Sequence, residues 1–314
     1  MSMVKEAMAA KRESLLLIIL VALILLFGGL SPNFLVPYSF TVMSQYLAEI
    51  GLLSLAITIG LISGLLDLSI GSIFGLSAVS IGLLAKTGLN IWVSAFLGVI
   101  IGMVAGGLNG ILAAFTPIPP LIITLSTQFI FAGISLALTR GNPVTGLPEN
   151  YSFIGQTQIG PVPLQLLVFL IVTIASSILM QYMGLGRKMR LMGKSNRVAW
   201  FSGVNVPMVK IMVYVLSGFL SALASIILTS RVMTARPDAG QTLGWTILTV
   251  AFLGGASLEG GTGTILGALF GAMIIVILST GIEVVGLDIG QRLLTQGLVL
   301  LVVAGTGRLL KIKD

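Results

Sequence analysis

The sequence contains no cysteine and no histidine, and only 9 % of its 314 residues are charged. Disulfides, thiolate or imidazole metal sites, and catalysis by cysteine or histidine are therefore excluded. A soluble domain has about 25 % charged residues, so the polar residues are too few to cover a water-soluble globule of this size. With 56 % hydrophobic residues and a mean hydropathy of +1.10, the sequence predicts an all-α polytopic membrane protein.

A membrane-spanning helix needs about 20 mostly apolar residues, and ten segments approach or exceed that length. They are 14–30, 44–65, 69–85, 91–115, 121–139, 163–183, 211–230, 244–257, 263–280 and 293–307. Ten spans are favoured. Nine or eleven stay open, because the second and third segments nearly fuse and the eighth and tenth are short. We expect residues 1–314 to form a single transmembrane domain.

Most of the 17 basic residues lie in three segments: the amino-terminal tail, the loop 184–210 and the carboxy-terminal tail. With ten spans all three fall on one side of the membrane, which the positive-inside rule identifies as the cytoplasm. Both termini are therefore expected there. The net charge of +7 is read as this topology signal and gives no indication of nucleic-acid binding.

Two apolar segments carry glycine at every fourth position, which places the glycines on one helix face. These glycines are Gly98, Gly102, Gly106 and Gly110, and then Gly263, Gly267 and Gly271. Such a face lets another backbone approach closely. The two segments lie five spans apart, an offset that reverses orientation and suggests an inverted repeat, although generic helix packing also explains each series alone.

Few ionisable groups lie at membrane depth, and Asp67 and Glu49 are the clearest. Asp67 stands between glycines, where a short acceptor side chain suits a sharp turn and caps the next helix. We expect a structural turn formed by Gly64, Asp67, Ser69 and Gly71, with direct contact between Asp67 and a solute left open. Glu49 is either functional or solvated near the start of a helix.

Neutral polar groups gather around a proline-rich connector, Pro117 to Pro120. Hydroxyl and amide side chains recur after it at spacings of three and four, on one face of a helix. Such a face suits hydroxylated ligands, and the alternative is hydrogen bonding between helices. The candidate substrate-pathway residues are Asn109, Thr124, Thr127 and Gln128.

The basic loop 184–210 contains a predicted two-turn helix, with Ser195 as its N-cap and Gly203 as its stop. Trp200 and Phe201 on so short a helix suggest a groove in a partner protein. The alternative is an aromatic belt at the membrane interface.

Nothing in the sequence indicates catalysis or a nucleotide site on this chain. Gly193-Lys194-Ser195 resembles the end of a phosphate-binding loop, but position 188, where the pattern needs glycine, is lysine. Glu49 and Asp67 are the only buried acids, and they show no acid–base spacing. We expect no metal, no catalytic residue and no enzyme activity.

Five segments together resemble a known family. They are Gly64–Gly71, Asn109-Gly110 with Pro119–Leu125, Gly186-Arg187, Ser202–Val206 and Leu253–Gly263. Their combination, in order over residues 40–305, resembles the permease subunits of ribose-type ABC sugar importers, in the superfamily of branched-chain amino acid and ribose permeases. Leu65-Leu66 and Leu243-Gly244-Trp245 depart from the ribose pattern. Arg197-Val198-Ala199 and the run from Ala235 to Gly240 look more like the autoinducer-2 import permeases.

The resemblance implies a multi-pass subunit of the bacterial cytoplasmic (inner) membrane. It implies pairing with a second permease chain, identical or different, and binding of two ATPase subunits that carry ATP and Mg. It also implies a periplasmic or surface-anchored solute-binding protein. The coupling residues would then be Arg187, Ser195, Arg197, Trp200, Phe201 and Gly203, and the outer docking residues Arg140, Arg231 and Arg236.

The leading hypothesis is therefore a permease for a monosaccharide or similar polyhydroxylated solute. Autoinducer-2 import is the alternative within the family. An ion-coupled secondary transporter is a more distant one, because it would need carboxylates in several spans.

Overall fold

The computed structural model describes residues 2–241 and 243–286, with side chains from residue 13 onward. Beyond them it describes 288, 290, 291, 293–295, 297, 298 and 301. The predicted tenth span, 293–307, lies largely outside the described residues, as does the basic carboxy-terminal tail.

Seven described helices are long and apolar enough to cross a membrane. They are α1 (Ser2–Leu30), α2 (Pro37–Ile62), α4 (Ile91–Phe115), α5 (Pro120–Thr139), α7 (Leu164–Gln181), α10 (Val206–Val232) and α12 (Ile265–Val284). Two shorter apolar helices are α3 (Ile70–Lys86) and α11 (Leu243–Leu253). The prediction of an all-helical polytopic membrane protein is thereby confirmed, and the first nine predicted segments each overlap one of these helices.

The connections hold smaller elements. The helical ones are η1 (Pro32–Leu35), η2 (Glu149–Tyr151), α6 (Ser152–Gln156), α8 (Gly184–Lys194) and α9 (Asn196–Phe201). The strands are β1 (Val144–Thr145), β2 (Gln158–Ile159), β3 (Val162–Pro163) and β4 (Thr234–Ala235). β1 pairs with β4, and β2 with β3, both antiparallel. These two-residue ladders fasten loops and do not change the all-α class.

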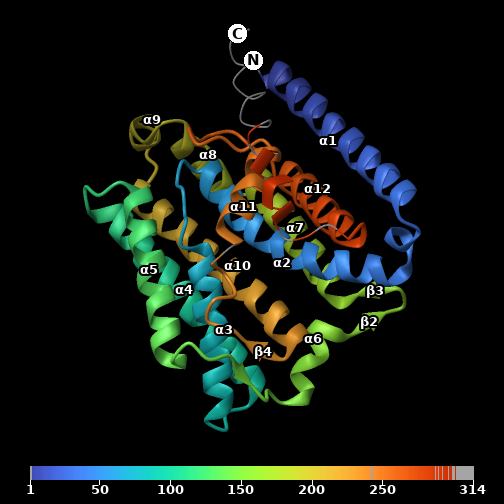
Figure 1. Ribbon diagram of the computed structural model, residues 1–314. Helices are drawn as coiled ribbons and strands as arrows, with labels where there is room; N and C mark the ends of the chain where they lie inside the picture. Colours follow the sequence, from blue (N-terminus) through green and yellow to red (C-terminus); the bar gives the residue numbers. More distant parts are fainter. Residues whose placement is uncertain are drawn as a thin grey trace.

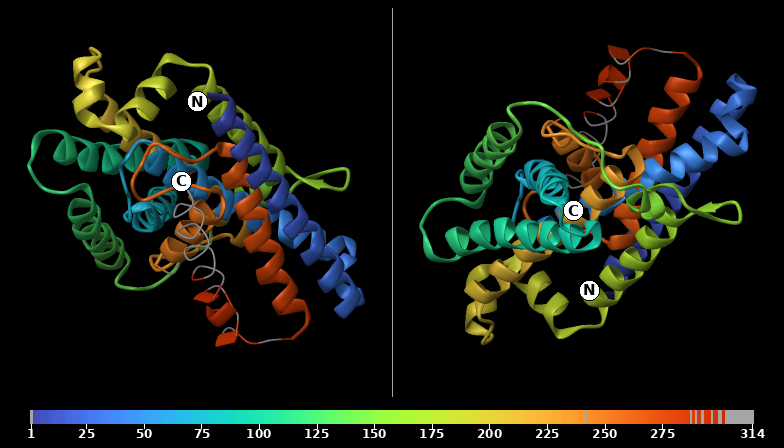
Figure 2. Two further views of the ribbon diagram at one scale, coloured as in Figure 1. Left: turned by 90° about the horizontal axis from the view of Figure 1, so that it is seen from above. Right: turned by 90° about the horizontal axis from the view of Figure 1, so that it is seen from below.

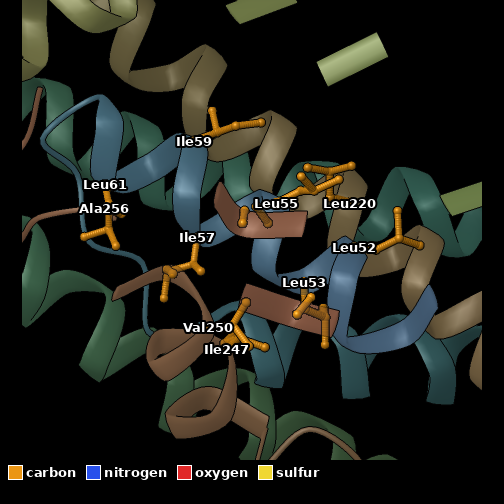
Figure 3. Close-up of a cluster of buried hydrophobic side chains, with 14 of the residues drawn as sticks. Leu52, Leu53, Leu55, Ile57, Ile59, Leu61, Leu220, Ile247, Val250 and Ala256 are labelled. Atoms are coloured by element: carbon orange, nitrogen blue, oxygen red, sulfur yellow. The ribbon is translucent and has the colours of Figure 1, made fainter. Parts of the chain in front are cut away.

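The centre of the molecule is the pair α2 and α10, around which the other helices pack (Figure 1). Every residue of α2 from Ala48 to Ile62 is buried. Its aliphatic side chains meet Leu220 of α10 and Ile247 and Val250 of α11 (Figure 3). Helices buried on all sides must be apolar all round, which explains why residues 50–62 lack charge.

The glycine series mark backbone-to-backbone contacts. A Cβ on Gly106 would overlap the Tyr214 carbonyl, and one on Gly218 of α10 would overlap the carbonyl of Gly102. In the second series, Gly267 of α12 faces Gly254, which follows α11, in the same way. Glycine is required at these places because any side chain would push the two backbones apart.

The packing follows a repeated pattern. α4 packs along α10 as α12 packs along α2, and α3 contacts α10 as α11 contacts α2. Each of these contacts therefore has a counterpart when α2 is exchanged with α10, α3 with α11, and α4 with α12.

Peripheral elements define two ends of the molecule. The first residues of α1 lie at the same end as α8 and α9, and we call this the α8–α9 end (Figure 1). The β2–β3 hairpin, α6 and β4 lie at the other, the hairpin end. Seen from above, α5 and α1 lie at the periphery of the molecule (Figure 2, left). α5 contacts chiefly α3 and α4, and α1 contacts α12.

Candidate functional site

The break between α2 and α3 is organised around Asp67. Its carboxylate accepts hydrogen bonds from the backbone N–H of Ser69 at 2.9 Å, the Ser69 hydroxyl at 2.6 Å and the Ser217 hydroxyl of α10 at 2.7 Å. Asn109 of α4 donates its amide to the Ser69 hydroxyl at 2.8 Å. This network connects the start of α3 with α4 and α10. Asp67 forms the predicted turn by bonding Ser69, the residue before α3, but it does not cap the first N–H groups of α3 as the sequence predicts.

The same break also holds α5. Thr124 and Tyr214 both donate their hydroxyls to the carbonyl of Leu66, at 3.3 and 3.4 Å. A carbonyl in an unwound segment lacks a helical partner and needs such donors when buried. α5 begins at Pro120, where the prolines prevent α4 from continuing, so its first turns lie beside the break.

A small cavity with room for about one water molecule opens between α3, α5 and the segment before α11. Its polar side chains are Ser72, Gln128 and Gln241, and the other lining residues are Leu68, Gly71, Ala132, Pro237, Gly240 and Gly244. None of these side chains is ionisable. A Cβ on Gly71 would overlap the carbonyl of Gly240. Glycine at position 71 therefore allows the backbones of α3 and of the segment before α11 to touch at the cavity wall.

The four candidate pathway residues have different surroundings. Gln128 lines the cavity. Asn109 is fully buried in the Asp67 network, and Thr124 is fully buried against Leu66. The Thr127 hydroxyl donates to the Ile123 carbonyl of its own helix at 3.1 Å. Of the four residues, Gln128 alone lines the cavity. The hydrogen bonds of the other three run within or between helices, which is the alternative that the sequence left open.

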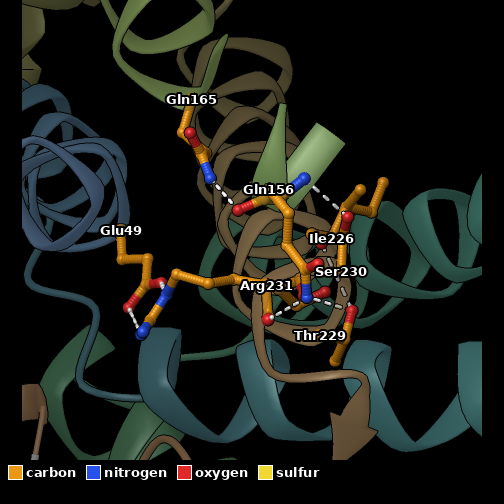
Figure 4. Close-up of polar contacts among 9 residues, drawn as sticks. Glu49, Gln156, Gln165, Ile226, Thr229, Ser230 and Arg231 are labelled. Carbon is orange, nitrogen blue, oxygen red and sulfur yellow. Dashed lines mark hydrogen bonds and ion pairs between the residues drawn. The ribbon is translucent and has the colours of Figure 1, made fainter. Parts of the chain in front are cut away.

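At the hairpin end, a network missed in the sequence fastens the loop after α5 to α10 (Figure 4). Gly155 donates its N–H to the Ser230 hydroxyl at 2.7 Å, and Gln156 donates to the Arg231 carbonyl at 2.9 Å. Gln165 of α7 donates to the Gly155 carbonyl. No sequence signal marks these contacts, because their partners lie 10 to 75 positions apart.

Arg231 was expected to project outward for docking, and its surroundings correct this. Its guanidinium binds both carboxylate oxygens of Glu49, at 2.7 and 3.2 Å. Glu49 is buried within α2, so the expectation of a solvated position near a helix start is also corrected. The buried carboxylate requires a compensating charge, and Arg231 provides it.

The other two predicted docking residues are exposed at the hairpin end. Arg236 pairs with Asp238 at 2.8 Å, and this hydrogen bond and charge lower the pKa of Asp238 below its ordinary value. Arg140 ends α5 in a left-handed conformation, with φ of 52°.

The short helix in the basic loop is confirmed as α9. Ser195 accepts a hydrogen bond from the backbone N–H of Val198, and Gly203 follows the helix with φ of +77°. The rings of Trp200 and Phe201 meet edge to face, and both are exposed, at 64 % and 70 %. Arg197 stacks over Phe201 at 5.9 Å, and Arg187 lies exposed on α8.

The sequence analysis did not predict helix α8 or the contacts that Arg190 makes from it. Arg190 donates to the carbonyls of Met180, at the end of α7, and Gly263. Partial burial lowers the pKa of this guanidinium. The hydrophobic face of α8, with Met189 and Met192, is the signal that could have revealed the helix. Among the described residues, no cluster of three acidic or metal-ligating side chains could hold a metal ion.

These features define a polytopic membrane protein whose central helices are joined by buried polar contacts. Residues 40–304 match the family described as the permease component of branched-chain amino acid transport systems, and the chain belongs to this family. It is the multi-pass permease component of a bacterial ABC importer, not its catalytic subunit.

Three curated relatives cover most of the chain. The ribose import permease RbsC of Bacillus subtilis is 35 % identical over 89 % of this chain and 88 % of its own length. The autoinducer 2 import permease LsrD of Klebsiella pneumoniae is 34 % identical over 88 % of this chain and 85 % of its own. LsrD of Photorhabdus laumondii is 32 % identical over 94 % and 90 %.

Proposed function

We propose that this permease translocates a monosaccharide or a similar small polyhydroxylated solute. The observation that carries the proposal is the neutral polar lining of the cavity: Ser72, Gln128 and Gln241 offer hydroxyl and amide groups. Such groups both donate and accept hydrogen bonds and thereby suit sugar hydroxyls. The names of the relatives support the same class, with autoinducer-2 as the alternative solute.

A second permease chain completes the pathway. The cavity within one chain has room for about one water molecule, far less than a sugar needs. Beside it, α5 exposes an apolar face that includes Leu125, Phe129 and Ile130. A second copy, or a related permease chain, would face this helix and enclose the solute between the two subunits.

We also infer a ten-span topology with an inverted repeat and cytoplasmic termini. The paired packing of α2 with α12 and of α10 with α4 supports the repeat. The basic residues of α8 and α9 support a cytoplasmic position for their end of the molecule. The hairpin end would then face the solute-binding protein.

The coupling site for the ATPase is proposed at α9 and its flanks. Ser195 and Gly203 delimit the helix, Trp200 and Phe201 supply an apolar anchor, and Arg187 and Arg197 add positive charge. ATP and Mg would be bound by the ATPase subunits.

Uptake into proteoliposomes that contain permease, ATPase and binding protein tests the pathway. Labelled ribose and labelled autoinducer-2 are assayed separately. Gln128→Leu removes hydrogen bonds worth about 0.5–1.5 kcal/mol each, so uptake of the true solute should fall about 2- to 10-fold.

Thr41→Ala is the matched control. Thr41 lies near the start of α2, away from α5, and its hydroxyl binds the Pro37 carbonyl of the same helix at 3.1 Å. Equal uptake by Gln128→Leu and Thr41→Ala would contradict the assigned pathway. Failure of both solutes with the unmodified protein would contradict the solute class.

A further inference from the structure

A second segment, residues 254–263, reaches the α8–α9 end between α11 and α12, and we call it the glycine loop (Figures 1 and 2). Its backbone is fixed by hydrogen bonds. Gly261 donates to the Ile62 carbonyl at 3.0 Å, and Ser257 accepts from Gly260 at 3.1 Å and, through its hydroxyl, from Glu259 at 3.2 Å. Gly260 and Gly261 both have positive φ, at 82° and 72°, which only glycine adopts without strain.

The glycine loop touches α8 and the end of α2 through backbone atoms. A Cβ on Gly260 would lie 2.8 Å from the Cα of Gly64. A Cβ on Gly193 of α8 would overlap the carbonyl of Ile62. Three backbones therefore meet without intervening side chains. α9 begins at Asn196, two residues after Lys194, and Lys194 itself contacts Gly261.

One apolar side chain projects from this fixed loop. Leu258 is 64 % exposed, the same exposure as Trp200 of α9. Its immediate neighbours in sequence, Ser257 and Glu259, are polar, which places this part of the loop in an aqueous setting instead of the lipid interior. A leucine held in water by a rigid backbone gains its apolar contacts only when a partner covers it.

We propose that Leu258 on the glycine loop is a second contact for the cytoplasmic ATPase, continuous with α8 and α9. The proposal rests on the proposed coupling function of α9. The partner is the ATPase because an ABC permease binds this subunit on the cytoplasmic side, and because the loop touches the segment that leads directly into α9. A rigid junction lets both contacts move together.

The absence of cysteine from the chain allows a direct test. Leu258→Cys, Phe201→Cys and Ile159→Cys are made singly. Ile159 lies on the β2–β3 hairpin and is 57 % exposed, so it reports on the opposite end. Each variant is labelled with a water-soluble maleimide in opened membrane vesicles, with and without the ATPase subunit.

The expected result is labelling of all three cysteines without ATPase. With ATPase, labelling is lost at Leu258→Cys and at Phe201→Cys and retained at Ile159→Cys. Loss at Phe201→Cys alone overturns the second contact and leaves the coupling role of α9 intact. Labelling of both cysteines in variants that still co-purify with the ATPase overturns the coupling role as well.

Two further outcomes count against the second contact. A Leu258→Cys that resists labelling without ATPase is buried in lipid or protein, and this overturns the proposal. Leu258→Asp, a variant on an exposed loop, should lower co-purification of the ATPase per permease. Unchanged co-purification together with unchanged uptake contradicts the proposal independently of labelling.

Discussion

The Glu49–Arg231 pair is more buried than the Arg236–Asp238 pair, and it joins the two central helices near the hairpin end. Removing one partner of a buried pair leaves the other charge uncompensated. Arg231→Ala should therefore lower the free energy of unfolding by about 3 kcal/mol. This lower end of the range applies because the Arg231 side chain is 29 % exposed.

Thermal unfolding of the purified permease in detergent measures this effect. Arg236→Ala is the matched control, because its pair with Asp238 is exposed, and its unfolding temperature should stay unchanged. Equal unfolding temperatures for both variants would show that the Glu49–Arg231 pair contributes nothing to stability.

Single residues differ in how far the sequence predicts them. Ser195 and Gly203 are read correctly, because a cap and a left-handed stop depend on neighbours within three or four positions. Asp67 is read correctly as a turn residue for the same reason. Its partner Ser217 is missed, since 150 positions separate the two residues.

At the scale of elements, α9 is the predicted link to the ATPase. The double change Trp200→Ala and Phe201→Ala removes two exposed rings, and a hydrophobic anchor in a partner groove contributes about 2 kcal/mol or more. Co-purified ATPase per permease should fall at least about 30-fold, while docking of the solute-binding protein survives.

An aromatic belt at the membrane interface would behave differently. It predicts less inserted permease with normal ATPase binding for each inserted molecule. Val198→Ala, a smaller change at a 53 % exposed position of the same helix, is the control for general disturbance. Full ATPase binding and full uptake by the double variant would contradict the coupling role.

Whole helices are predicted well where apolar length is the signal. α4 matches its predicted bounds, 91–115, and α5 begins one residue early. α8 is not predicted by this signal, because an amphipathic helix with four basic residues has no long apolar run. α11 has 11 residues and spans only about 16 Å, and its role as a span could not be decided from composition.

At the scale of the molecule, charge at the hairpin end should guide the solute-binding protein. Arg140→Glu and Arg236→Glu should each weaken docking, and the loss should shrink as salt rises, since exposed charges are screened over about 10 Å at 0.1 M. Lys188→Glu, exposed on α8 at the opposite end, should leave docking unchanged.

Association rates measured at several salt concentrations give the test. Asp238→Asn adds a converse arm, because it frees Arg236 from its neighbour and should strengthen docking. A loss that is independent of salt, or an equal loss in Lys188→Glu, would contradict an electrostatic docking role.

The global arrangement lies largely beyond the sequence. Periodic glycines correctly indicate close helix contacts, but they do not say that α4 meets α10 or that Gly254 meets Gly267. The neutral stripe of α5 is visible in the sequence, whereas the cavity also needs Gln241 from a distant loop. Pairing between helices depends on the tertiary fold, which no local pattern encodes.

The glycine contact between α4 and α10 determines where the molecule is stiff. Side chains at an interface can change rotamer and so absorb a shift, but Gly106 and Gly218 have none to change. α4 and α10 are therefore expected to move together as one rigid unit. The peripheral helix α5, Pro120–Thr139, is freer to move. Its hydrogen bond to the segment between α2 and α3 is made through Thr124. During opening and closing, α5 would move relative to the rest of the molecule, while α4 and α10 keep their positions relative to each other.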